Sequence, residues 1–376
     1  MISDAIKNSL QVIETDLQYI CGSLKDEFAC LSGKRLLITG GAGFLGYYLI
    51  QTVLYWNKNH NKADAIELTV YDNCLLGIPG WLRQLEGTEH LLVKIQNISD
   101  ILPEDIGAFH YIIHAASIAS PTYYRRYPIE TMDANVTGLR NLLGYSVKQQ
   151  ETNDPVEGFL FFSSSEIYGN PSPENIPTPE TYNGNVSCTG PRACYDESKR
   201  YGETLCVNFA GQCGVPVKSA RPFNNYGPGL KITDKRVIPD FAGDVLSGKD
   251  IVMLSDGSPK RTFCYVADAI VGYYKILVKG HSGMAYNIGV EGPEISMVEL
   301  AEKIANLAGV LYDYKGKVVR RNSPDKKYLV DNPDRRCPDI SKARAELGYN
   351  PLISLDEGLV RSLIWYQDNR ATGEIL

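Results

Sequence analysis

The sequence predicts an α/β protein in which a Rossmann-type, doubly wound parallel sheet is joined to a smaller, mixed α/β lobe. Apolar runs of strand length alternate with segments of helical period from residue 34 to about residue 224, a pattern typical of a parallel sheet with helices on both faces. A glycine-rich turn follows the first of these runs. With 376 residues, 44% of them hydrophobic, the chain is also long enough to bury a large core.

Three parts follow one another along the chain. Residues 1–32 are expected to form an amphipathic helical extension, since they carry acids throughout and no apolar run of signal-peptide or membrane-span length. Residues 33–224 are expected to form the sheet domain. Residues 225–376, where loops with Gly, Pro and cations separate shorter elements, are expected to form mainly a second lobe, interleaved with late elements of the first domain. The expected strands are "RLLITG", "AIELTVYDN", "LLVKIQN", "YIIHAA", "GFLFFSSS" and "VPVKSARPFN".

Charge and cysteine usage argue against several classes of function. The net charge of −6 gives no reason to expect nucleic acid or a membrane as partner. The nine cysteines are odd in number and lack a CxxC pair, so neither a disulfide framework nor a zinc site is expected. The five histidines have no ligand spacing, and we therefore expect no metal. Together these features favour a cytoplasmic protein.

The glycine-rich turn predicts a dinucleotide site. In "ITGGAGFLGYYL", Gly40, Gly43 and Gly46 follow a strand and open a helix, where backbone amides can approach a pyrophosphate. Alone, the motif is also compatible with a tight turn that binds nothing. Asp72, which ends the next strand 26 positions beyond Gly46, is placed to bind ribose hydroxyls and favours NAD over NADP. The candidate cofactor contacts are Gly40, Gly43, Phe44, Leu45, Gly46, Asp72, Asn73, Ala115, Ala116, Tyr195 and Lys199.

A tyrosine and a lysine provide the candidate base. In "CYDESKR", Tyr195 and Lys199 are four residues apart on one helix face. The lysine charge, together with a positive nicotinamide ring, would lower the pKa of the phenol and make it a usable base near neutral pH. The pair alone could also be an ordinary surface pair. Its occurrence after a glycine turn and a strand that ends at Ser164 makes the catalytic interpretation specific.

These motifs, in this order, resemble the extended short-chain dehydrogenase/reductase family of nucleotide-sugar enzymes. The resemblance runs from Lys34 to about Asp368 and is strongest to the branch of UDP-glucuronate decarboxylases, also called UDP-xylose synthases. The matching segments are "SIASPTYYRRYPIET" (117–131), "GPRACYDESKR" (190–200), "RPFNNYGP" (221–228), "RTFCYVAD" (261–268) and "PDISKARAELGY" (338–349). Members of the family commonly form homodimers through two helices per subunit, and the resemblance implies the same here.

The resemblance also implies a reaction. Tyr195 would take the proton of the sugar 4-hydroxyl while NAD+ takes the hydride from C4. A sugar with a carboxylate on C5 then becomes a β-keto acid, which loses CO2 as the electrons flow into an enolate that Tyr195 and Ser164 can hydrogen-bond. After C5 is protonated, the hydride returns to C4. UDP-glucuronate would thus become UDP-xylose, with the NAD recycled.

The strand end that contains Ser164 distinguishes this reaction from its relatives. In 4,6-dehydratases of the family the three positions read Thr-Asp-Glu, whereas here they are Ser164, Ser165 and Glu166. The acid that protonates a departing hydroxyl is therefore missing, and Ser165 can face a substrate carboxylate without like-charge repulsion. Simple 4-epimerases usually have no acid at the position of Glu166, so this residue favours chemistry at C5, through an ordered water or by direct proton transfer. The alternatives are a 4,6-dehydratase or 4-epimerase and, from another class, a catalytically silent NAD-binding regulator.

The substrate would carry a diphosphate and a carboxylate, so several cations should converge on its site. Arg261 and Arg336 match family positions that hold the diphosphate, which suits the planar fork of arginine. Arg192 would either bind phosphate or anchor the start of its helix. The segment "GLKITDKRVIPDF" departs from the usual decarboxylase pattern. The candidate substrate contacts are Ser120, Tyr124, Arg192, Asn224, Arg261 and Arg336.

Overall fold

The computed structural model describes residues 6–60, 63–321, 330 and 332–370, and its centre is a seven-stranded parallel sheet. The strand order β11-β6-β5-β4-β1-β2-β3 is that of a doubly wound sheet, which confirms the predicted fold class. The six strands expected from the sequence are β1–β6. The strand bounds are β1 (Arg35–Thr39), β2 (Glu67–Asp72), β3 (Leu91–Ile95), β4 (Tyr111–His114), β5 (Gly158–Phe162), β6 (Val217–Pro222) and β11 (Ala285–Ile288).

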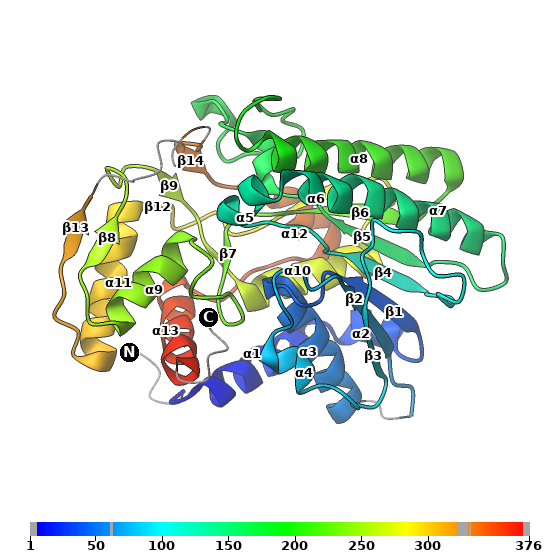
Figure 1. Ribbon diagram of the computed structural model, residues 1–376, viewed down its shortest axis with the longest axis horizontal. Helices are drawn as coiled ribbons and strands as arrows, with labels where there is room; N and C mark the ends of the chain where they lie inside the picture. Colours follow the sequence, from blue (N-terminus) through cyan, green and yellow to red (C-terminus); the bar gives the residue numbers. More distant parts are fainter. Residues whose placement is uncertain (1–5, 61–62, 322–329, 331, 371–376) are drawn as a thin grey trace.

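Helices cover both faces of this sheet, as Figure 1 shows. One face carries α6, α7 and α8, and the other carries α3, α10 and α12. The inner strands β4 and β5 are buried along their whole length, which explains their unbroken apolar sequences "YIIH" and "GFLFF". The helix bounds of this domain are α3 (Phe44–Asn59), α4 (Gly80–Arg83), α5 (Pro121–Arg126), α6 (Pro128–Asp133), η1 (Ala134–Gly138), α7 (Leu139–Gln150), η2 (Ser165–Tyr168), η3 (Pro173–Asn175), α8 (Ala193–Cys213), α10 (Val266–Lys279) and α12 (Ser341–Leu347).

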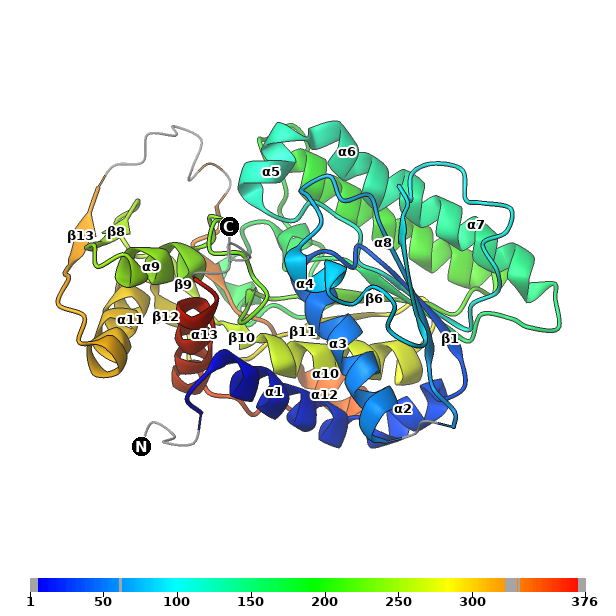
Figure 2. The ribbon, with the colours of Figure 1, turned by 60° about the horizontal axis from the view of Figure 1, so that its bottom comes forward.

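A smaller lobe packs at one end of the sheet and lies on the left in Figures 1 and 2. Its elements come from the region after Tyr226, but α10, β11 and α12 of the same region return to the main sheet. In the described residues, the lobe contains a parallel pair of strands, a small three-stranded sheet and three helices. Its elements are β8 (Ile251–Met253), β9 (Lys260–Arg261), β12 (Ile295–Ser296), β13 (Val318–Arg320), β14 (Arg335–Arg336), α9 (Val237–Leu246), α11 (Met297–Tyr312) and α13 (Leu355–Asn369).

Two helices precede the first strand. The N-terminal helix α1 (Ser9–Ser23) begins at Asn8, whose side chain accepts a hydrogen bond from the backbone amide of Gln11, and α2 (Lys25–Leu31) follows directly. Both lie on the same side of the sheet as α3 and α10 (Figure 2). The predicted extension therefore packs onto the main domain, and its first five residues lie outside the described residues.

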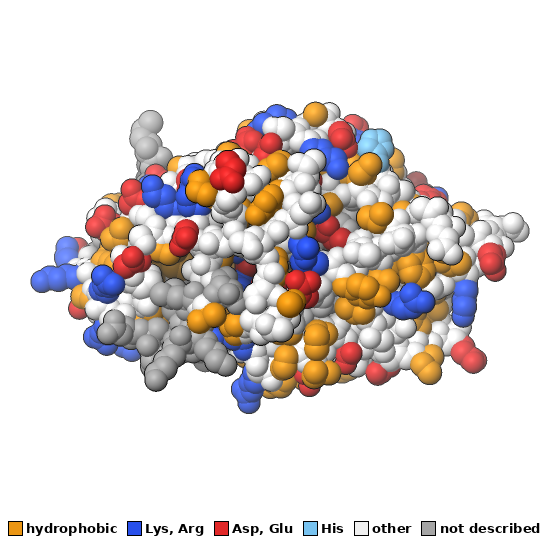
Figure 3. Space-filling view, turned by 90° about the horizontal axis from the view of Figure 1, so that it is seen from above, with side chains coloured by type: hydrophobic (Ala, Val, Ile, Leu, Met, Phe, Trp, Pro, Cys, Tyr) orange, Lys and Arg blue, Asp and Glu red, His pale blue; other side chains and the backbone are white. Residues whose placement is uncertain are grey.

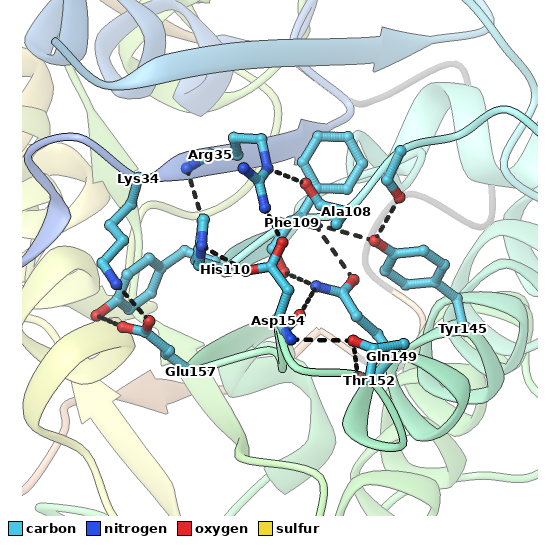
Figure 4. Close-up of polar contacts among 12 residues, drawn as sticks. Lys34, Arg35, Ala108, Phe109, His110, Tyr145, Gln149, Thr152, Asp154 and Glu157 are labelled. Carbon is cyan, nitrogen blue, oxygen red and sulfur yellow. Dashed lines mark hydrogen bonds and ion pairs between the residues drawn. The ribbon is translucent and has the colours of Figure 1, made fainter.

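A polar network closes the amino ends of the strands, as Figure 4 shows. The backbone amide of Arg35 donates to Nδ1 of His110, whose Nε2 lies 2.8 Å from the Asp154 carboxylate. Lys34 pairs with Glu157 at 2.6 Å beside this group. These side chains bond one another. A ligand site is expected at the opposite edge of the sheet, where the carboxyl ends of the strands lie.

Candidate active site

A cavity of about 870 Å³ lies between the carboxyl edge of the main sheet and the smaller lobe. The sheet domain contributes the glycine turn and the ends of β2, β4 and β5, and the lobe contributes residues of β8, β9, β14 and α9. The structure brings every candidate site residue to the wall of this cavity, namely Gly40, Gly43, Phe44, Leu45, Gly46, Asp72, Asn73, Ala115, Ala116, Ser120, Tyr124, Ser164, Ser165, Glu166, Arg192, Tyr195, Lys199, Asn224, Arg261 and Arg336. Their individual roles remain predictions.

The glycine turn has the shape that a pyrophosphate requires. Gly40 has a φ of +78°, and a Cβ atom there would lie 2.5 Å from the backbone of Ala116. A Cβ atom at Gly46 would lie 2.3 Å from the carbonyl oxygen of Gly41. The Asp72 carboxylate accepts hydrogen bonds from the backbone amides of Ala42 (2.9 Å) and Cys74 (2.7 Å), which fix it beside the turn. These residues fit a dinucleotide with free ribose hydroxyls.

Tyr195 and Lys199 project from α8 into the floor of the cavity. The Lys199 ammonium donates to the carbonyl oxygen of Phe162 at 2.6 Å and lies 5.6 Å from the centre of the Tyr195 ring. The Tyr195 ring stacks on Tyr124, with 5.2 Å between centroids. The Ser164 hydroxyl accepts from the backbone amide of Glu166 and also bonds the phenol. The predicted tyrosine, lysine and serine are therefore together in one place.

Burial changes the pKa values of both Tyr195 and Lys199. Burial raises the pKa of Tyr195 to about 12, although the Ser164 hydroxyl acts in the opposite direction. Burial also lowers the pKa of Lys199 to about 7. Both groups are withdrawn from water, which acts against the charged form of each. A positive nicotinamide ring would act to lower the pKa of Tyr195.

Glu166 lies at the centre of a buried cluster of charges. Its two carboxylate oxygens each accept from one Nη of Arg336, at 2.5 Å, and it also pairs with Arg192. Burial acts to raise the pKa of Glu166, but Arg192 and Arg336 outweigh it and hold the pKa well below its usual range. Asp196 lies 3.6 Å from Arg192, and burial together with Glu166 raises the pKa of Asp196 to about 8. Glu166 is therefore a fixed anion.

Two further candidate substrate contacts, Arg261 and Asn224, donate hydrogen bonds to backbone carbonyl oxygens. The Arg261 guanidinium donates to the carbonyl oxygens of Lys260, Pro333 and Asp334, so it fixes β9 to the loop before β14. Burial and Arg336 lower its pKa to about 9. Asn224 has a φ of +42° and donates to the carbonyl oxygen of Thr262.

Sequence reasoning missed three cations on the cavity wall. Lys231, Lys235 and Arg236 belong to the loop before α9, within the segment "GLKITDKRV" that departs from the decarboxylase pattern. Arg236 pairs with Asp234 at 2.8 Å, and its charge acts to lower the pKa of Tyr195. The signal was present in the sequence, because three cations within six residues stand out in an acidic chain.

His114 lies beneath the cavity as a neutral structural residue. It is fully buried, and its ring nitrogens bond the hydroxyl of Thr39 (2.7 Å) and the carbonyl oxygen of Ala134 (3.1 Å). Burial, aided by the charge of Lys199, lowers its pKa to about 3. Among the residues that the structure describes, no group of three or more histidine, cysteine or acidic side chains is arranged to hold a metal ion.

The chain belongs to the NAD-dependent epimerase/dehydratase family, which matches residues 36–289. NAD is accordingly the cofactor that the glycine turn and Asp72 would hold. No helix within the described part of the chain is long and apolar enough to cross a membrane.

The chain is similar to individual relatives over most of its length. UDP-glucuronic acid decarboxylase 5 of Arabidopsis thaliana is 35% identical over 336 residues, covering 89% of this chain and 90% of that protein. UDP-glucuronic acid decarboxylase 1 of Xenopus tropicalis is 34% identical, covering 89% and 72%. Among solved structures, the dTDP-glucose 4,6-dehydratase DesIV of Streptomyces venezuelae with NAD and TYD bound has a TM-score of 0.76 and 26% identity, covering 90% of this chain and 98% of that one.

Proposed function

We propose that this enzyme is an NAD-dependent nucleotide-sugar decarboxylase that converts UDP-glucuronate to UDP-xylose through a 4-keto sugar. One observation carries the proposal: the cavity that Tyr195 lines is also lined by Ser165 and by Glu166, whose carboxylate is paired with Arg192 and Arg336. A carboxylate with so low a pKa is a weak base. Dehydration requires a base for the C5 proton, whereas loss of CO2 breaks the bond between C5 and the carboxylate and requires none.

The residues of the chain have separate tasks in this reaction. Tyr195 accepts the proton of the 4-hydroxyl, and the Ser164 hydroxyl orients the phenol. Bound NAD supplies the hydride acceptor, and later the donor, at C4. When CO2 leaves C5, the electron pair moves into the enolate between C5, C4 and the C4 oxygen, and the Tyr195 hydroxyl hydrogen-bonds that oxygen. C5 then takes up a proton from a water molecule. The Lys199 ammonium donates to the carbonyl oxygen of Phe162, and this bond fixes it next to the Tyr195 ring.

The charges around the cavity support a substrate with two anionic parts. Arg192, Arg336 and Arg236 lie on its wall together with Lys231 and Lys235. Glu166, Asp234 and Asp240 pair with these cations and neutralise only part of this positive charge. A nucleoside diphosphate and a sugar carboxylate would supply the remainder. The relatives named as UDP-glucuronic acid decarboxylases support the same substrate.

The direct test is to incubate the purified protein, with and without added NAD, with UDP-glucuronate, UDP-glucose and dTDP-glucose. Products are followed by mass spectrometry and proton NMR. Loss of the mass of CO2 from UDP-glucuronate alone is the expected result. Loss of the mass of water from a neutral hexose would identify a 4,6-dehydratase, and a change at C4 without a change in mass would identify an epimerase. NAD binding without turnover of any of them would identify a silent regulator.

We also propose that the protein forms a homodimer through the face that carries α8. Figure 3 looks onto the upper side of Figure 1, and hydrophobic side chains gather there between charged ones. Ile129 on α6 and Tyr201 and Val207 on α8 are each more than half exposed. Analytical ultracentrifugation is expected to give twice the mass of the chain for the wild type and a lower mass for Val207→Asp. A monomeric wild type would contradict this proposal.

A further inference from the structure

Helix α1 crosses the boundary between the two halves of the protein. It lies before the region that matches the family, which begins at residue 36. It packs against α3 and α10 of the sheet domain and against α13 of the smaller lobe, and Figure 2 shows it running beneath all three. A helix in this position is able to set the orientation of one half relative to the other.

One carboxylate of this helix, that of Asp16, bonds side chains of three other elements. Asp16 is fully buried, and its Oδ2 accepts hydrogen bonds from the hydroxyls of Tyr48 on α3, at 2.5 Å, and of Tyr265 on β10 (Cys264–Tyr265), at 2.7 Å. Its Oδ1 pairs with Arg361 on α13 at 2.5 Å. Tyr48 lies on the helix that the glycine turn opens. Tyr265 and Arg361 belong to the segments that build the substrate side.

A second contact of α1 strengthens the same connection. The Tyr19 hydroxyl donates to Asp268 at 2.5 Å, and Asp268 also accepts from the backbone amides of Leu352 (3.0 Å) and Ile353 (2.9 Å), which lead into α13. Asp16 thus reaches the smaller lobe directly, through Arg361, and Tyr19 reaches the segment before α13 indirectly, through Asp268 of α10.

Tyr265 connects Asp16 to the cavity. In β10 it pairs with Tyr226 of β7 (Asn225–Tyr226), and the two rings are in contact at 5.6 Å. The neighbouring amide of Cys264 donates to the carbonyl oxygen of Asn224. Asn224 and Tyr226 both line the cavity. Because Asn224 is in the left-handed region of φ, which a residue with a side chain rarely adopts, its conformation depends on these bonds.

We infer that Asp16 is a positioning residue that sets the substrate side of the cavity in register with the cofactor side. A buried carboxylate is a poor choice for stability alone, since an apolar side chain of similar size would avoid the loss of hydration. The bonds of Asp16 to α3, β10 and α13 are directional, and all three form together only in one relative arrangement of these elements. The inference rests on the proposed function in one respect, because it takes a nucleoside diphosphate to be the ligand that the substrate side binds.

The test compares two affinities, those for UDP and for NAD, by isothermal titration calorimetry on the full chain. Tyr265→Phe and Tyr48→Phe each remove one hydroxyl and leave the pair of Asp16 with Arg361, so both variants are expected to fold. Each is expected to weaken UDP binding by about tenfold and to leave NAD affinity within about twofold. Asp16→Asn is expected to have the same effect more strongly.

Glu14→Gln is the matched control. Glu14 lies on the same helix and also accepts from a tyrosine hydroxyl of α3, that of Tyr55 at 2.9 Å, but on the exposed surface, where it also accepts from Gln18 of its own helix. It is expected to bind UDP as the wild type does. A Tyr48→Phe variant that melts at a lower temperature but binds UDP normally would give Asp16 a purely structural role and overturn the inference. A wild type that binds UDP yet does not decarboxylate UDP-glucuronate would overturn only the proposed function, and one that binds neither UDP nor dTDP would overturn both.

Discussion

Replacing Glu166 by glutamine is expected to destabilise the protein without nucleotide and to tighten its binding of UDP. The glutamine keeps the size of the side chain but removes the carboxylate that Arg192 and Arg336 share, so that Asp196, 3.6 Å from Arg192, is the acid that remains beside them. Removing one partner of a buried ion pair costs about 3–5 kcal/mol. For a chain of 376 residues this lowers Tm by about 4–6 °C. A diphosphate then meets two cations that have lost the Glu166 carboxylate, which it would otherwise have to displace.

The assay is thermal unfolding of wild type and Glu166→Gln at several concentrations of UDP, with the UDP dissociation constant measured by calorimetry. UDP is expected to raise the Tm of the variant more than that of the wild type, because only the variant lacks an anion at this place. Glu197→Gln is the control, since Glu197 is exposed and pairs with Arg200 at 3.6 Å on the surface of α8, where loss of the pair changes stability by about 1 kcal/mol or less. Equal Tm and equal UDP affinity in wild type and Glu166→Gln would refute the reasoning.

Three further predictions concern the floor of the cavity. Tyr195→Phe is expected to lower turnover by at least about 100-fold while calorimetry still detects bound NAD, because only the oxygen that takes the proton is lost; turnover near that of the wild type would remove Tyr195 from the reaction. Ser165→Asp is expected to raise KM for UDP-glucuronate, since it sets one anion against another, and unchanged kinetics would mean that Ser165 does not face the substrate carboxylate. His114, whose pKa is about 3 in the folded chain against 6.5 for a free side chain, takes up a proton on unfolding between these values, so stability falls as the pH drops below 6.5, by about 2 kcal/mol at pH 5. Urea unfolding at pH 7 and pH 5 should show a smaller difference for His114→Asn than for the wild type, and an equal difference in both proteins would assign the acid sensitivity to other groups.

The sheet and the glycine turn could be predicted because their signals are local. A fully buried strand such as β5 is apolar throughout, and the conformation of Gly40 excludes a side chain, so each leaves a pattern within a few residues. The meeting of Ser164 with Tyr195 also followed from the rule that functional groups gather at the carboxyl edge of a parallel sheet.

The charged contacts could not be predicted, because they join positions far apart in the chain. Glu166 and Arg336 are separated by 170 positions, and neither segment indicates that its partner is the other. Asp16 lies on an amphipathic helix, where an acid ordinarily faces water; its burial depends on Tyr48, Tyr265 and Arg361. The pKa of Tyr195 likewise follows from how deeply the ring is buried, which spacing along a helix does not reveal.

The cluster around Glu166 has an evolutionary consequence. Its three members are supplied by the turn after β5, the start of α8 and the short strand β14, so no single insertion or exchange of a segment replaces them all. A lineage that lost the acid at position 166 would retain two unbalanced cations, and one that lost either arginine would leave a poorly balanced anion. In an alignment of related sequences, positions 166, 192 and 336 should therefore change together, and such joint changes should coincide with changes of substrate.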